Sequence, residues 1–254
     1  MVLDSFRLDG RVALVTGGNR GLGQAAAVAL AEAGADVALL GRTAPDETVR
    51  QIAALGRRAH FVSCDLAKAG PAELADAAGL ARTELGGLDI LVNNAGIIRR
   101  APAVQTTAAD WDDVRTVNVD AVFHLSQAAG RLMIEQGAGK IINVASMLSF
   151  QGGIRVPAYT AGKHAVLGIT RALANEWAAL GVNVNAIAPG YMATDNTQAL
   201  RDDPARAGAI LDRIPAGRWG TPGDLAGAVV FLASDAARYV HGAVLPVDGG
   251  WLAR

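Results

Sequence analysis

The stretch Val12-Ala13-Leu14-Val15-Thr16-Gly17-Gly18-Asn19-Arg20-Gly21-Leu22-Gly23 decides the fold that we predict for this chain. Its first five residues form a short apolar run between glycines, which is typical of a buried strand. The glycines then permit a sharp turn, and the alanine-rich stretch up to Ala33 predicts a helix. Strand, glycine turn and helix are the context of a phosphate-binding loop, where a helix start presents free N–H groups to an anion. A tight turn without a ligand remains the alternative, because the spacing Gly-x-x-x-Gly-x-Gly is not the commoner Gly-x-Gly-x-x-Gly.

Strands and helices continue to alternate along the rest of the chain. The predicted strands are 36–40, 59–63, 88–92, 140–145, 182–187 and 243–247. The predicted helices are 48–55, 72–85, 110–135, 157–180, 196–213 and 221–233, with Asp110 as the cap of the longest one. This alternation predicts an α/β fold with a doubly wound parallel sheet and helices on both faces. No linker or repeat interrupts it, so we expect one domain over residues 1–254.

The composition narrows the class of protein. The 254 residues are 51% hydrophobic and carry a formal net charge of −1, which gives no basic signature for nucleic acid or a membrane surface. Cys64 is the single cysteine and the four histidines lack metal-ligand spacing, so we expect neither a disulfide nor a metal site. The start has no signal-peptide core, and no apolar run is long enough to span a membrane. We therefore expect a cytoplasmic protein.

Polar residues gather where the predicted strands end. In open parallel sheets, ligands bind beyond the carboxyl ends of the strands. The residues at these ends are the glycine loop, Arg42, Asp65-Leu66, Asn93-Asn94-Ala95-Gly96, Ser146 and Pro189-Gly190. Asp65 fits a helix cap as well as an adenine contact, and Asn93 and Asn94 fit a structural role at the sheet end. The shared location nevertheless predicts a nucleotide site.

The end of the second strand bears on the choice of nucleotide. An acidic residue there selects NAD through the ribose 2′-hydroxyl, whereas an arginine accommodates the 2′-phosphate of NADP. Gly41 replaces the acid, Arg42 follows it, and Arg20 in the first loop adds another cation. These residues favour NADP slightly, although both arginines could equally be solvated surface residues.

Tyr159 and Lys163 are the leading candidates for chemistry. They lie four positions apart in a predicted helix, so their side chains leave the same face. A neighbouring ammonium lowers the pKa of a phenol, which can then exchange a proton with an alcohol oxygen near neutral pH. Taken alone, the pair is explained equally well by a tyrosine beside a solvated lysine.

These residues together resemble the short-chain dehydrogenase/reductase family over nearly the whole chain. The matching positions are Thr16 to Gly23, Asn93 to Gly96, Asn118, Ser146, Tyr159, Lys163, Pro189-Gly190 and Thr194. The resemblance implies a Rossmann-type fold, an NAD(P) cofactor, and hydride transfer between that cofactor and a carbonyl or alcohol. It also implies a homotetramer.

The resemblance assigns a role to each catalytic candidate. Tyr159 is the acid/base, Lys163 lowers its pKa and holds the nicotinamide ribose, and Ser146 binds the reacting oxygen. Asn118 keeps a proton-relay water near Lys163. Hydride transfer to a carbonyl leaves negative charge on its oxygen, and Ser146 and Tyr159 can donate hydrogen bonds there.

The resemblance also implies a set of nucleotide contacts, with the Met192 backbone and Thr194 at the carboxamide and pyrophosphate. The expected contacts are Gly17, Asn19, Arg20, Gly21, Leu22, Gly23, Arg42, Asp65, Leu66, Asn93, Ala95, Gly96, Tyr159, Lys163, Pro189, Gly190, Met192 and Thr194.

Several stretches resemble one subgroup of this family, the 2-keto-3-deoxygluconate 5-dehydrogenases, also named 2-deoxygluconate 3-dehydrogenases. They include 93–100, 146–157, 188–194, 214–220 and 247–254. The resemblance implies a keto-sugar acid substrate in bacterial uronate breakdown, interconverted between 2-keto-3-deoxygluconate and its 2,5-diketo form. It also implies NAD, against the slight preference for NADP that Arg20 and Arg42 indicate.

A carboxylate substrate needs a guanidinium partner. Arg99, Arg100 and Arg155 lie in loops expected to line the site, and we expect at least one of them to bind the carboxylate. Gln151 and Tyr191 are weaker candidates for hydroxyl contacts. Together with Ser146 and Tyr159, they form the predicted substrate site.

Three other functions stay open at this point. Two are enzymes, a gluconate 5-dehydrogenase and a 3-oxoacyl carrier-protein reductase. The latter should carry a basic patch for its acidic carrier, and the net charge of −1 gives no sign of one. The third is a nucleotide-sensing regulator without turnover, which would have no need of an activated phenol.

Overall fold

A seven-stranded parallel sheet forms the centre of the protein in the computed structural model, which describes residues 1–254. Its strands run in the order β3-β2-β1-β4-β5-β6-β7. Their bounds are β1 Val12–Thr16, β2 Asp36–Gly41, β3 Ala59–Ser63, β4 Ile90–Asn93, β5 Gly139–Val144, β6 Val182–Pro189 and β7 Val244–Val247. The order reverses between β1 and β4, which is the switch point where doubly wound sheets bind ligands. The predicted doubly wound parallel sheet is confirmed.

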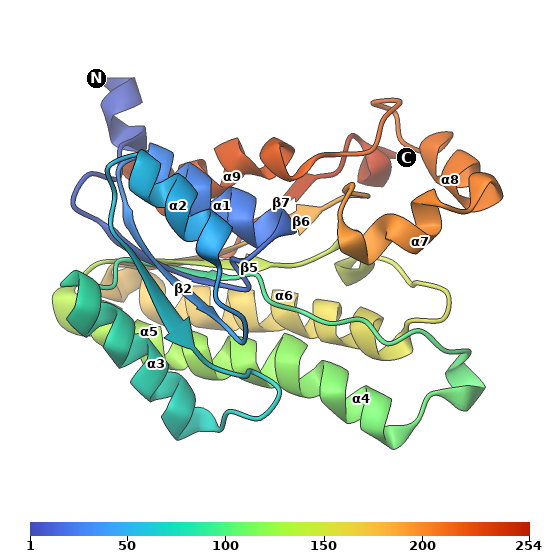
Figure 1. Cartoon of the computed structure of the whole chain (residues 1–254), viewed down its shortest axis with the longest axis horizontal. Coiled ribbons are helices and arrows are strands. Elements are labelled where there is room, and N and C mark those ends of the chain that lie inside the picture. The colour runs from blue at the N-terminus through green and yellow to red at the C-terminus, as the bar shows by residue number, and fades with distance from the viewer.

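Helices cover both faces of the sheet (Figure 1). One layer contains α1 Gly21–Glu32, α2 Asp46–Ala54 and α9 Ala226–Ala233, and the other contains α3 Pro71–Leu85, α4 Ala108–Arg115, α5 Ala121–Gln136 and α6 Pro157–Trp177. Strand β1 supplies both cores because successive side chains point to opposite faces. Its Ala13 and Val15 join the core beneath α1, and its Leu14 joins the core with α3 and α5. No helix is both long and apolar enough to cross a membrane.

The longest predicted helix contains an irregularity. It runs through α4, a π-helical turn at Thr116–Asp120 and then α5. The prediction that Asp110 caps it was wrong, because the hydroxyl of Thr107 accepts a hydrogen bond from the Asp110 backbone N–H at 3.0 Å. The Asp110 carboxylate accepts from the same hydroxyl at 2.8 Å, so the two residues hold the helix start together.

The predicted single helix over residues 196–213 was also wrong. A short turn at Asp195–Thr197 leads into α7 Gln198–Arg201, and α8 Pro204–Leu211 follows separately. Proline lacks a backbone N–H and disfavours a helical residue before it, so the chain breaks at Pro204. Asp203 then caps α8 by accepting hydrogen bonds from the two N–H groups of Ala205 and Arg206. Residues 195–213, which we term the cover segment, lie beyond the carboxyl end of the sheet (Figure 1).

Candidate active site

A cavity of about 1200 Å³ opens at the carboxyl ends of the strands. It is large enough for a dinucleotide together with a small substrate. All of the predicted site residues line this cavity except Asn93 and Asn118. The structure therefore brings together the glycine loop, the ends of β2, β4, β5 and β6, the start of α6 and the cover segment.

Asn93 does not reach the cavity, so the structure does not support the predicted nucleotide contact of its side chain. The residue is 3% exposed, and its amide nitrogen donates to Ser126 and Asn143, each at 2.9 Å. Its side chain points from the end of β4 into the core below α5. The neighbouring Asn94 does line the cavity, and it donates to the carbonyls of Thr16 and Gly17, which holds the glycine loop against β4.

Asn118 is fully buried within the π-helical turn. Its side chain accepts from the N–H of Ile97 at 2.9 Å and donates to the carbonyl of Ile97 at 3.0 Å. The oxygen and the nitrogen of the Asn118 side-chain amide are therefore both used to fix the segment that follows β4. The site for a relay water beside Lys163, which the resemblance implied, would have to use the backbone around Asn118 rather than its side chain.

The glycine loop is shaped for close approach of backbone to a ligand. A Cβ at Gly23 would lie 2.2 Å from the carbonyl oxygen of Gly17, so no larger residue fits there. Gly17 itself has φ 67°, a conformation that glycine adopts readily. Helix α1 starts at Gly21 without a side-chain cap, which leaves its first N–H groups facing the cavity. These groups fit a pyrophosphate.

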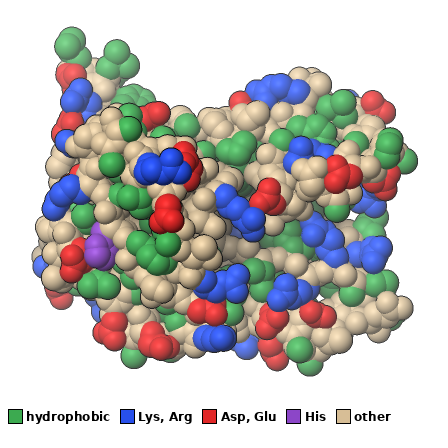
Figure 2. All heavy atoms as spheres, viewed as in Figure 1, with side chains coloured by type: hydrophobic (Ala, Val, Ile, Leu, Met, Phe, Trp, Pro, Cys, Tyr) green, Lys and Arg blue, Asp and Glu red, His purple; other side chains and the backbone are tan.

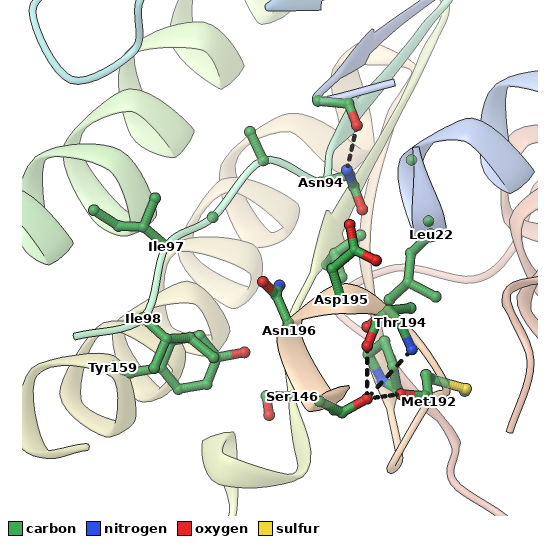
Figure 3. A pocket seen from close by; sticks show the side chains of 18 of the residues that line it. Leu22, Asn94, Ile97, Ile98, Ser146, Tyr159, Met192, Thr194, Asp195 and Asn196 are labelled. Atoms are coloured by element: carbon green, nitrogen blue, oxygen red, sulfur yellow. Dashed lines mark hydrogen bonds between the residues drawn. The ribbon is translucent and has the colours of Figure 1, made fainter. Parts of the chain in front are cut away.

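Ser146, Tyr159 and Lys163 lie together at the other side of the switch point. Ser146 follows β5, and its hydroxyl oxygen accepts from the N–H of Leu148 at 3.1 Å, which leaves the hydroxyl hydrogen free to donate. Tyr159 lies in the first turn of α6 and Lys163 one turn later. Figure 3 shows the hydroxyls of Tyr159 and Ser146 pointing into the same space, with Asn196 on the facing wall.

Burial dominates the electrostatics of this group. It raises the pKa of the Tyr159 phenol, with the Ser146 hydroxyl and then Arg100 acting in the opposite direction. It also lowers the pKa of Lys163 to about 8. The Lys163 ammonium donates to the carbonyl of Val144 at 2.6 Å and lies 5.6 Å from the centre of the Tyr159 ring. In the protein alone, the predicted lowering of the Tyr159 pKa by Lys163 is therefore not found.

The nucleotide-ribose end of the cavity holds both predicted arginines. Arg42 is exposed at the end of β2, whereas Arg20 forms an ion pair with Asp195 of the cover segment at 2.7 Å. Asp65 accepts from the N–H of Ala67 at 3.1 Å, so it holds a turn as well as lining the cavity. No acidic residue stands at the end of β2, where Gly41 leaves open space for a larger group.

The three arginines predicted to bind a carboxylate differ in their surroundings. Arg99 pairs with Asp113 at 2.9 Å and Asp110 at 3.6 Å, so its charge is already balanced. Arg100 donates to the backbone carbonyl of Asn196 at 2.9 Å and has no acidic partner. Arg155 adopts φ 63°, which is uncommon outside glycine. Of these three arginines, only Arg100 and Arg155 have no acidic side chain within ion-pair distance, so only their charges are unbalanced.

The cover segment adds cations that the sequence did not single out. Arg206 and Arg213 line the cavity, and Lys and Arg side chains gather around the hollow on this face (Figure 2). Trp251 lies against Arg213 and packs with Met147, Ile210 and Ile214. The predicted helix over residues 196–213 carries no indication that Arg206 and Arg213 line the cavity.

Comparisons with known proteins agree with this geometry. A family model described as enoyl-(acyl carrier protein) reductase matches residues 17–252. The 2-dehydro-3-deoxy-D-gluconate 5-dehydrogenase of Escherichia coli is 57% identical, and the alignment covers 100% of both chains. The chain belongs to the short-chain dehydrogenase/reductase family. The predicted family and the predicted class of enzyme, an oxidoreductase, are confirmed.

Two solved structures extend the comparison to the cofactor. One, provisionally described as a 2-deoxy-D-gluconate 3-dehydrogenase from Agrobacterium tumefaciens with bound NADP, is 59% identical over 98% of this chain and 99% of that one, with a TM-score of 0.93. The other is a gluconate 5-dehydrogenase from Burkholderia cenocepacia in complex with NADP and tartrate. It is 41% identical over 100% of both chains, with a TM-score of 0.94. NADP is thus the nucleotide that both of these relatives hold.

Proposed function

We propose that this protein is an NADP-dependent dehydrogenase of a sugar acid, and that its substrate is 2-keto-3-deoxygluconate, which is oxidised at C5. The observation that carries the proposal is the cavity itself. It is lined by the glycine loop, by the Ser146–Tyr159–Lys163 group and by several arginines without an acidic partner. The full-length similarity to enzymes of this substrate supports the choice of sugar acid. Gluconate is the second candidate, supported by the relative that binds NADP and tartrate.

The residues of the cavity fit a dinucleotide. The open helix start at Gly21 suits the pyrophosphate, and Arg20 and Arg42 suit a 2′-phosphate. Lys163 lies where it can hold the nicotinamide ribose while keeping its hydrogen bond to Val144. The bound nicotinamide would supply hydride transfer to or from the substrate carbon.

The protein groups then handle the proton and the oxygen. Ser146 donates a hydrogen bond to the substrate oxygen, which becomes more negative as the carbonyl is reduced. Tyr159 exchanges the proton with the same oxygen. Because burial raises the pKa of Tyr159 in the protein alone, the phenol carries its proton and is ready for the reductive direction. The oxidative direction requires the phenolate, which the nearby charges of Lys163 and an oxidised nicotinamide would favour.

Absorbance of the reduced nicotinamide tests the proposal directly. Purified protein is mixed with 2-keto-3-deoxygluconate and either NADP or NAD, and gluconate is run in parallel. We expect reduction of NADP with 2-keto-3-deoxygluconate at a kcat/KM at least tenfold above that with gluconate. A reverse order would move the proposal to a gluconate 5-dehydrogenase, and no reduction with any sugar acid would reject it.

Replacing Tyr159 by Phe separates an enzyme from a nucleotide-sensing regulator. The substitution removes only the hydroxyl that exchanges the proton, a contribution of about 10²- to 10⁴-fold in rate. We expect kcat to fall by this factor while the Kd for NADP stays within about threefold. Unchanged turnover would exclude Tyr159 as the acid/base.

We also propose a homotetramer, which the family resemblance supports. Light scattering coupled to size exclusion measures it, and a mass of four chains is expected. A monomer would contradict the proposal without affecting the assignment of the reaction.

A further inference from the structure

Arg213 occupies a position suited to binding an anion. It follows α8 in the cover segment, and its guanidinium carbon lies 4.0 Å from the ring centre of Trp251. One of its nitrogens donates to the Gln151 side chain at 3.4 Å. All three residues line the cavity, and no carboxylate lies within ion-pair distance of Arg213. A guanidinium stacked on a ring keeps its in-plane N–H groups available, and these match a carboxylate fork.

The Trp251 ring is a fixed platform for this guanidinium. The residue is 4% exposed and packs with Met147, Ile210 and Ile214. Its ring also meets that of Tyr191 edge to face at 4.7 Å. Met147 follows Ser146 directly, so the same apolar cluster joins the cover segment to the strand end that carries a catalytic candidate. Arg213 itself is exposed, but the Trp251 ring on which it stacks is anchored beside the residue that follows Ser146.

The other cations of the cavity are less suited to the substrate carboxylate. Arg99 is balanced by two aspartates. Arg100 already donates to the backbone carbonyl of Asn196 at 2.9 Å. In 2-keto-3-deoxygluconate the carboxylate carbon is four bonds away from C5, so its partner need not touch the reacting oxygen. Arg206 and Arg213 also line the cavity, and they belong to the cover segment.

We propose that Arg213, stacked on Trp251 and supported by Arg206, binds the substrate carboxylate and makes the site select sugar acids over neutral polyols. This inference rests on the proposed function. It assigns recognition of the carboxylate to a residue of the cover segment, whereas the sequence predicted Arg99, Arg100 or Arg155.

The test compares Arg213→Gln and Arg213→Lys with the wild type. The control is Arg238→Gln, which makes the same charge change at an exposed position. The Arg238 backbone lies beside Asn183 near the start of β6, at the amino ends of the strands and so at the end of the sheet opposite the cavity. Each protein is assayed with NADP and either 2-keto-3-deoxygluconate or the neutral polyol galactitol. Calorimetry also measures binding of 2-keto-3-deoxygluconate to the protein in the presence of NADPH, with which that hydroxy acid gives no oxidation.

We expect Arg213→Gln to raise KM and Kd for the sugar acid at least tenfold with little change in kcat, while kcat/KM for the polyol changes less than threefold. Arg213→Lys should lie between it and the wild type, because lysine keeps the charge but loses the fork. An equal fall for acid and polyol, or an unchanged Kd for the acid, would overturn the inference. If the wild type binds the acid without oxidising it and Arg213→Gln abolishes that binding, the proposed function fails while the carboxylate site stands.

Discussion

Lys163 is a charged group buried inside the protein. Its burial lowers the free energy of unfolding by an amount that depends on pH. Burial lowers its pKa to about 8 in the folded protein, from 10.5. Between these two values the unfolded chain binds more protons than the folded one, so stability rises with pH. Below pH 8 both states carry the proton, and the full cost of the buried charge is present. Replacing Lys163 by Met removes this dependence.

We therefore expect the wild type to gain about 2 kcal/mol in free energy of unfolding relative to Lys163→Met between pH 7 and pH 9.5. Urea unfolding of both proteins at each pH measures the difference. Lys68→Met is the control, because it makes the same charge change at a side chain that is 85% exposed. A constant difference between wild type and Lys163→Met would mean that Lys163 keeps an ordinary pKa.

At the scale of single residues, the chemistry could be predicted from the sequence, but the partners of each side chain could not. The spacing of Tyr159 and Lys163 places both side chains on one helix face, and the structure has them there. The effect of burial on both pKa values depends on packing from distant segments. Asn93 likewise points into the core because of Ser126 and Asn143, which lie 33 and 50 residues away in the sequence.

At the scale of the element, a single substitution at the end of β2 should change the preference between NAD and NADP. A Cβ at Gly41 would meet no atom within 4 Å, so a longer side chain fits there without a clash. An aspartate at this position would accept from the ribose 2′-hydroxyl of NAD and repel the 2′-phosphate of NADP. We expect Gly41→Asp to shift the ratio of kcat/KM for NAD to that for NADP at least tenfold toward NAD. Gly41→Asn is the matched control without charge, and an equal shift in both variants would contradict the electrostatic account.

The strands were predictable because each is a short apolar run followed by a glycine or polar turn. The helix boundaries were less so, since they depend on local hydrogen bonds that several residues could make. Thr107 and Asp110 are both good caps, and only the structure shows that Thr107 takes the position. The prediction of one helix over 196–213 overlooked Pro204, which disfavours a helical residue before it.

At the scale of the whole molecule, the cavity is built from segments that lie far apart in the sequence. Its nucleotide end could be predicted because it uses glycine turns at strand ends, which follow a general rule for parallel sheets. Its substrate end could not, because it depends on how the cover segment and Trp251 pack against the residue after Ser146. The ion pair between Arg20 and Asp195 joins these two ends across 175 positions of the chain.

This ion pair leads to a prediction about nucleotide binding. The Asp195 carboxylate lies 2.7 Å from the Arg20 guanidinium and would compete with a phosphate of NADP for it. Asp195→Asn removes that competition, and exposed pairs of this kind are weak, so we expect the Kd for NADP to fall by about two- to fivefold. In Arg20→Gln the same Asp195→Asn change should have no effect, because there is no longer a cation to release. Titration of the four proteins with NADP forms a double-mutant cycle. If Asp195→Asn changes the Kd equally in both backgrounds, Asp195 affects NADP by a route that does not involve Arg20.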